Sequence, residues 1–186
     1  RWRCKGIERA DSMAWDPHKM MLMPLSAGMV LVREGKDLER AFAQSAPYLF
    51  HGADSEVELS PDLGKRSFQC SRRADALKVW VSLQRFGGGG IGARYDALCD
   101  SAIALYEELS EQPVTKPLHV PESNILAWEN GEHDPALIAE ARSKLNLSDA
   151  AWITSTAIAG RSCLRVTMMN ARSRDAERHR LASSPS

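Results

Sequence analysis

The sequence predicts a chain of mixed helices and strands that ends in a small α+β domain. An apolar run rich in β-branched residues at positions 27–32 is typical of a buried strand. Apolar side chains at helical spacing predict two long helices, over positions 73–86 and 91–110. After position 116 the pattern changes to strand, helix, strand, strand, which indicates a small α+β unit.

The elements before the two long helices surround a predicted turn at positions 16–19. Positions 12–15 are expected to form a short strand leading into this turn, where a proline disfavours helix at the preceding residue. A helix is predicted over positions 35–46 and should end at Pro47. Positions 50–64 are rich in glycine, aspartate and serine, and a loop of this length is expected to be functional or disordered.

Glycines at positions 87–90 must interrupt the helical pattern. They follow a helix and no Lys-Ser or Lys-Thr comes after them, so they indicate a linker or helix terminator and not a phosphate-binding loop. Farther on, Asp134 and Pro135 have the residue types that begin a helix. Strands are predicted at positions 124–128, 151–158 and 163–169, the last two joined by a tight connection containing Gly160.

Composition excludes several classes of protein. With 186 residues and 44% hydrophobic content the chain can bury a core. Lys+Arg and Asp+Glu number 24 each, so no net charge would recruit nucleic acid or an anionic membrane. The sequence contains no apolar run of membrane-spanning length and no visible signal peptide. The four cysteines lack metal-site spacing, and reduced thiols in a cytoplasmic protein are expected.

Lys19 is the candidate nucleophile. It lies between Pro17-His18 and a methionine-rich run, so apolar neighbours on its C-terminal side would take water away from the amine. A desolvated lysine keeps part of its amine neutral, as covalent chemistry with a carbonyl requires. The alternative is a lysine that extends its charged group into water at a strand edge. The neighbouring methionines indicate core packing and not a metal site.

The context of Lys19 matches a known family in several blocks. These blocks, in order, are GIERADS (6–12), WDPHKMM (15–21), YLF (48–50), QCSRRADALK (69–78) and LRVTMMN (164–170). The chain therefore resembles the group II pyridoxal-phosphate-dependent amino-acid decarboxylases, which include the glutamate, aromatic amino-acid, diaminobutyrate and cysteine sulfinate decarboxylases. The resemblance covers nearly the whole chain up to about residue 173.

The resemblance implies an α/β fold, namely the end of the large domain of a fold-type I pyridoxal-phosphate enzyme followed by the small domain. Positions 1–112 would belong to the large domain, 113–171 to the small domain, and 172–186 to a disordered tail. A basic arm touching nucleic acid is the alternative for the tail. Since the family's cofactor-binding region precedes the lysine, we expect the chain to be the C-terminal part of a longer, homodimeric enzyme.

The resemblance also assigns roles to individual residues. Lys19 would be the lysine that bonds to the cofactor, with His18 and Asp16 close to the cofactor phosphate. Because a carboxylate repels a phosphate, Asp16 is expected to face backbone donors or a cation. Arg165 would bind a carboxylate of an acidic amino-acid substrate. Strand alternation places Arg165 opposite the apolar face of Leu164, and the alternative is a surface arginine on an edge strand.

The loop at positions 50–64 departs from the family, because it has no tyrosine. In relatives a loop tyrosine helps to protonate the product, and counting back from the QC block puts Val57 at its place. His51 is the loop's aromatic acid–base group, and a solvent-exposed histidine without a role is the alternative. Three outcomes stay open: amino-acid decarboxylation, a changed reaction that forms aldehyde, or a non-catalytic remnant or dimerisation module.

Overall fold

The computed structural model describes residues 4–42, 63–69, 71–131, 134–148 and 152–170. Val57, His51, Pro47 and the predicted tail at 172–186 lie outside the described residues. The chain divides into two compact units, Arg1–Gln84 and Arg85–Ser186. The predicted domain limits after residues 112 and 171 stay predictions.

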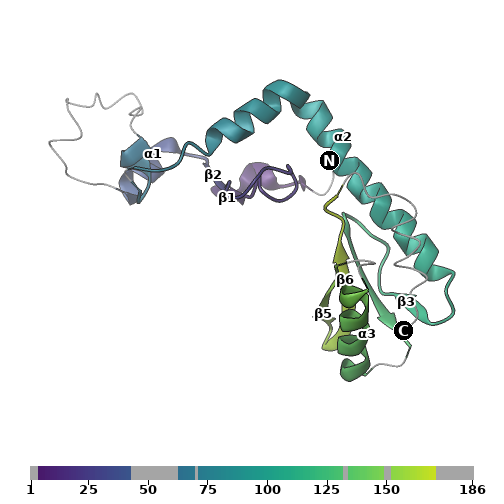
Figure 1. Ribbon diagram of the computed structural model, residues 1–186. Coiled ribbons are helices and arrows are strands. Elements are labelled where there is room, and N and C mark those ends of the chain that lie inside the picture. Colours follow the sequence, from purple (N-terminus) through teal and green to yellow (C-terminus); the bar gives the residue numbers. More distant parts are fainter. Residues whose placement is uncertain (1–3, 43–62, 70, 132–133, 149–151, 171–186) are drawn as a thin grey trace, which may run out of the picture. The chain divides into compact units, whose positions relative to one another are not determined.

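The first unit contains a two-stranded antiparallel sheet (Figure 1). Strand β1 (Ser12–Trp15) pairs with β2 (Met29–Val32) from Ser12 opposite Val32 to Trp15 opposite Met29. The 3-10 helices η2 (Ile7–Arg9) and η3 (Leu63–Arg66), the helix α1 (Gly35–Ala41) and the start of α2 (Ala76–Ser110) complete this unit. The predicted strand at 12–15 is confirmed.

The prediction of a buried strand at 27–32 is wrong in two respects. β2 begins two residues later, at Met29, because the Ala27 carbonyl accepts hydrogen bonds from His18 in the preceding turn and not from a strand. Val30 and Leu31 are also 55% and 46% exposed. A sheet of two strands leaves them uncovered within the described part of the chain.

Helix α1 ends at Ala41, before the predicted end at residue 46. Phe42 leaves helical geometry as the C-cap, and its ring packs edge-to-face against Phe68 at a centroid distance of 6.4 Å. The predicted break at the glycines between the two long helical patterns is confirmed at one residue. Gly87 has φ 64° and ψ 171°, outside helical geometry, whereas the glycines after it are helical within α2.

The second unit contains a four-stranded antiparallel sheet (Figure 1), and the strand order is β3-β4-β6-β5. The strands are β3 (Thr115–Pro117), β4 (Ile125–Asn130), β5 (Thr154–Ile158) and β6 (Arg161–Thr167). Helix α3 (Pro135–Leu147) contacts β4, β5 and β6. The core includes fully buried residues from the helices, the sheet and a connecting loop: Leu98, Leu105, Leu109, Leu126, Ile153 and Leu164.

Local chemistry explains the ends of these elements. The Asp134 side chain accepts a hydrogen bond from the Ala136 amide at 2.8 Å, which confirms the predicted helix start. β5 and β6 are joined by a two-residue turn in which Ala159 and Gly160 both have positive φ, at 51° and 77°. β3 was not predicted, because it is a three-residue edge strand ending in Pro117.

Candidate active site

The candidate site is the turn that follows β1. The Lys19 amide donates to the Asp16 carbonyl at 3.0 Å, and the Met23 amide donates to the Pro17 carbonyl at 3.1 Å. Pro17, Met21 and Met23 are buried. Lys19 between them is exposed, whereas Asp16 and His18 are half-buried. The turn therefore carries Asp16, His18 and Lys19 on one short segment, as the sequence predicts.

Lys19 forms an ion pair with Asp16. Its Nζ lies 2.5 Å from Asp16 Oδ2, and the two side chains are 60% and 42% exposed. The hydrogen bond from Lys19 lowers the pKa of Asp16, against an opposing effect of desolvation. Asp16 thus faces a cation, as expected. The expectation that methionines desolvate the amine is wrong, since Met21 and Met23 are buried while Lys19 stays in water.

His18 is held by Ala27, in the segment between the turn and β2. Its Nδ1 lies 2.6 Å from the Ala27 carbonyl oxygen, and its amide donates to the same oxygen at 3.4 Å. A carbonyl oxygen can only accept, so Nδ1 carries the proton of this hydrogen bond. In the neutral ring Nε2 then keeps a free lone pair, and the ring orientation is set by the backbone at Ala27.

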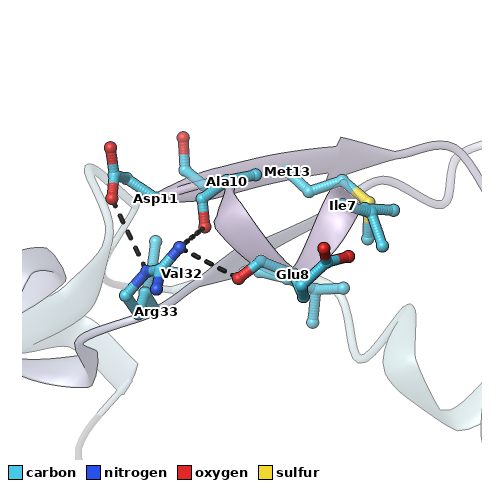
Figure 2. A pocket seen from close by; sticks show the side chains of 9 residues that line it. Ile7, Glu8, Ala10, Asp11, Met13, Val32 and Arg33 are labelled. Carbon is cyan, nitrogen blue, oxygen red and sulfur yellow. Dashed lines mark hydrogen bonds and ion pairs between the residues drawn. The ribbon is translucent and has the colours of Figure 1, made fainter. Parts of the chain in front are cut away.

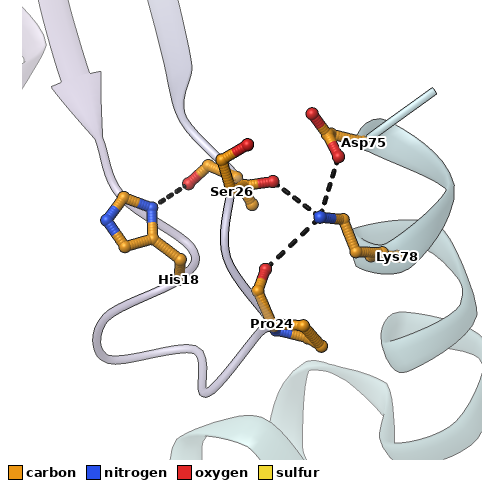
Figure 3. A network of polar contacts seen from close by, with 6 residues as sticks. His18, Pro24, Ser26, Asp75 and Lys78 are labelled. Carbon is orange, nitrogen blue, oxygen red and sulfur yellow. Dashed lines mark hydrogen bonds and ion pairs between the residues drawn. The ribbon is translucent and has the colours of Figure 1, made fainter. Parts of the chain in front are cut away.

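A polar network next to this turn was missed by the sequence analysis. Figure 3 shows Lys78 of α2 between Asp75 and the segment that follows the turn. Lys78 Nζ donates to the carbonyls of Ser26 at 2.6 Å and Pro24 at 3.3 Å. The spacing of Asp75 and Lys78 on a helix could have indicated their own pairing, but not the contact with residues 24 and 26.

Arg33 stabilises the other end of the same sheet. A shallow pocket of about 240 Å³ lies there, between η2 and the ends of β1 and β2 (Figure 2). Arg33 Nη2 donates to the carbonyls of Glu8 and Ala10, both at 3.1 Å, and its Nε is 3.6 Å from Asp11 Oδ1. Through these contacts the Arg33 guanidinium stabilises the position of η2. Arg33 therefore serves the local fold and not ligand binding.

Arg165 belongs to the second unit. It lies on β6 opposite Ala127 of β4 and Thr154 of β5, so its strand is paired on both sides and is not an edge strand. Its flanking residues Leu164 and Val166 are buried, whereas Arg165 is half-buried. The predicted alternation is therefore confirmed from Leu164 to Met168, whereas Cys163, on the Arg165 side of the strand, is also buried.

The residues of the turn fit the attachment of pyridoxal phosphate. The amine of Lys19 is accessible to an aldehyde, and the fixed imidazole of His18 is a neighbour that can contact a planar or anionic group. Within the described ranges, each helix is too short or too polar to cross a bilayer. The described part of the chain also contains no group of three or more His, Cys, Asp or Glu side chains that could hold a metal ion.

Comparison with known proteins identifies the family. The family model described as the pyridoxal-dependent decarboxylase conserved domain matches residues 1–123. An acidic amino acid decarboxylase of Bos taurus is 38% identical over 67% of this chain and 24% of its own length. A cysteine sulfinic acid decarboxylase of Mus musculus is 34% identical over 66% of this chain and 25% of its own length. The chain thus spans about a quarter of these relatives.

Solved structures share the fold. The crystal structure of mouse CSAD has a TM-score of 0.81 and 24% identity, over 97% of this chain and 40% of that one. The Oryza sativa TDC structure with PLP and tryptamine has a TM-score of 0.84 and 20% identity, over 96% and 38%. These likenesses confirm the predicted fold class, the end of a fold-type I large domain followed by the small domain. The chain belongs to the pyridoxal-dependent decarboxylase family.

Proposed function

We propose that this chain is the C-terminal part of a pyridoxal-phosphate-dependent amino-acid decarboxylase in which Lys19 bonds to the cofactor. The observation that carries the proposal is the exposed Lys19 amine on a turn whose apolar residues are buried. The family match across residues 1–123 supports it, because the matched region contains this turn. The decarboxylase names of the two curated relatives support the same reaction class.

A longer enzyme would explain the exposed apolar surface of the first unit. Val30 and Leu31 on β2, and Leu77, Trp80 and Val81 on α2, are each 46–58% exposed. Burying such side chains stabilises a protein by about 1.5–3 kcal/mol each, so further chain or a second subunit is expected to cover them. The coverage of only 24% of a relative's length supports further chain, and a homodimer is part of this proposal.

Each residue of the turn has a role in this proposal. Pyridoxal phosphate, when bound, supplies an electron sink for the electron pair that the departing carboxylate leaves behind. Lys19 would hold the cofactor through Nζ. Lys19 is paired with Asp16, so this ion pair would have to open for Nζ to reach the cofactor. His18, oriented by Ala27, offers its Nε2 side to the cofactor.

An acidic substrate is the favoured class. A guanidinium binds a carboxylate through two parallel hydrogen bonds, and Arg165 is half-buried on a strand whose position is fixed by pairing on both sides. The two relatives are named for acidic amino acid and cysteine sulfinic acid substrates. Glutamate, aspartate and cysteine sulfinate are therefore the first candidates.

Three described cysteines, Cys4, Cys99 and Cys163, are free thiols, which supports a cytoplasmic location.

The test uses the full-length protein that carries this chain. After loading with pyridoxal phosphate and borohydride reduction, peptide mass spectrometry should find the phosphopyridoxyl group on Lys19. Lys19→Ala should abolish this adduct and the release of carbon dioxide, whereas the matched control Lys5→Ala, at an exposed lysine, should keep both. An adduct on another lysine refutes the role of Lys19. A protein that binds the cofactor nowhere and releases no carbon dioxide would be the non-catalytic remnant.

A further inference from the structure

The backbone after the candidate turn is held at its carbonyl groups by one side chain. Lys78 Nζ lies 2.6 Å from the Ser26 oxygen, 3.3 Å from the Pro24 oxygen and 2.8 Å from Asp75 Oδ1 (Figure 3). An ammonium group has three N–H donors, and here it meets three acceptors. The Lys78 side chain is 25% exposed, so water competes only partly for these donors.

These contacts continue into the turn itself. Ser26 is followed by Ala27, whose carbonyl receives both the ring and the amide of His18, and His18 precedes Lys19. Fastening the backbone at residues 24 and 26 therefore restricts where the Ala27 oxygen lies, and with it the His18 ring. Asp75 stabilises the charge that makes these contacts, and the hydrogen bond from Lys78 lowers the pKa of Asp75.

We propose that Lys78 is a positioning residue that holds the segment following the Lys19 turn, residues 24–27, and thereby orients His18 and Lys19 for the cofactor. This inference rests on the proposed role of Lys19. An ordinary pair between Lys78 and Asp75, the residue just before α2, would stabilise only the start of this helix, and by little. The two carbonyl contacts distinguish a positioning role from such a local pair. They join Lys78 to Ser26 and Pro24, which precede it by 52 and 54 positions in the sequence.

Hydrogen exchange of the full-length protein without cofactor tests the positioning directly. Lys78→Met keeps an unbranched side chain, shorter by one heavy atom, but removes all three donors. Amide exchange at His18 and Met23, which close the turn, should become roughly tenfold faster, as expected from loss of a charge-assisted hydrogen bond. Lys78→Arg keeps a donor group and should restore much of the protection. Lys5→Met, at an exposed lysine outside this network, is the matched control and should change nothing.

The second readout is the rate at which added pyridoxal phosphate bonds to Lys19, followed by its visible absorbance. Lys78→Met should slow this step several-fold, and Lys78→Arg should recover part of the rate. Unchanged exchange at the turn, or faster exchange spread equally over every segment of Lys78→Met, would overturn the inference. If Lys78→Met fails to fold, Asp75→Asn replaces it, and its exchange must rise at the turn. Hydrogen exchange measures the contacts of Lys78 with the backbone even if no adduct forms on Lys19. Failure of the proposed function can therefore be told apart from failure of this inference.

Discussion

Removing the side chain of Leu164 should destabilise the second unit strongly. Leu164 is 0% exposed on β6, which pairs with β4 and β5 and contacts α3. Leu164→Ala deletes the equivalent of three methylene groups, or about 2.4 kcal/mol at about 0.8 kcal/mol each. The unfilled cavity adds to this, so we expect a loss of about 3 kcal/mol in the free energy of unfolding, within the usual range for such changes.

Urea unfolding followed by circular dichroism measures this loss. With a slope of about 2 kcal/mol per molar urea, the midpoint should fall by about 1.5 M. The matched control is Leu147→Ala, because Leu147 is 84% exposed at the end of α3 and the same deletion there should cost at most about 0.5 kcal/mol. Equal midpoint shifts in the two variants would refute the reasoning that burial of β6 holds this unit together and fixes the direction of Arg165.

Three further predictions concern single groups. Burial raises the pKa of the Cys163 thiol, so iodoacetamide should alkylate exposed Cys4 in the native chain and Cys163 only after unfolding; early labelling of Cys163 contradicts this. Lys19 lowers the pKa of Asp16 in the folded chain, so the ion pair stabilises the fold at neutral pH. This contribution is lost as the pH falls below 3.8, the ordinary pKa of an aspartate. Asp16→Asn should therefore flatten the acid limb of stability against pH, and an unchanged limb counts against the pair. In the full-length protein, Val57→Tyr should raise the ratio of amine to aldehyde product, since valine has no proton to donate; an unchanged ratio means the proton comes from elsewhere.

Features set by neighbours in the chain could be predicted from the sequence. The turn at Pro17, the helix start at Asp134 and the helix break at Gly87 each depend on backbone preferences or on a contact two residues away. The candidate lysine was found in the same way, because Lys19 is part of a continuous block of residues. The alternation that directs Arg165 away from Leu164 follows from the period of a strand.

What depends on distant partners was decided by the tertiary structure. Lys78 reaches the carbonyls of Pro24 and Ser26, and no local pattern specifies a contact between backbone atoms more than fifty residues away from it. Lys19 is exposed while its neighbours Met21 and Met23 are buried, a division that their shared sequence context does not specify. Sequence periodicity identifies apolar residues, but which of them are covered depends on the segments that pack against them. Hydrophobic burial is non-directional, so only the assembled fold determines its partners.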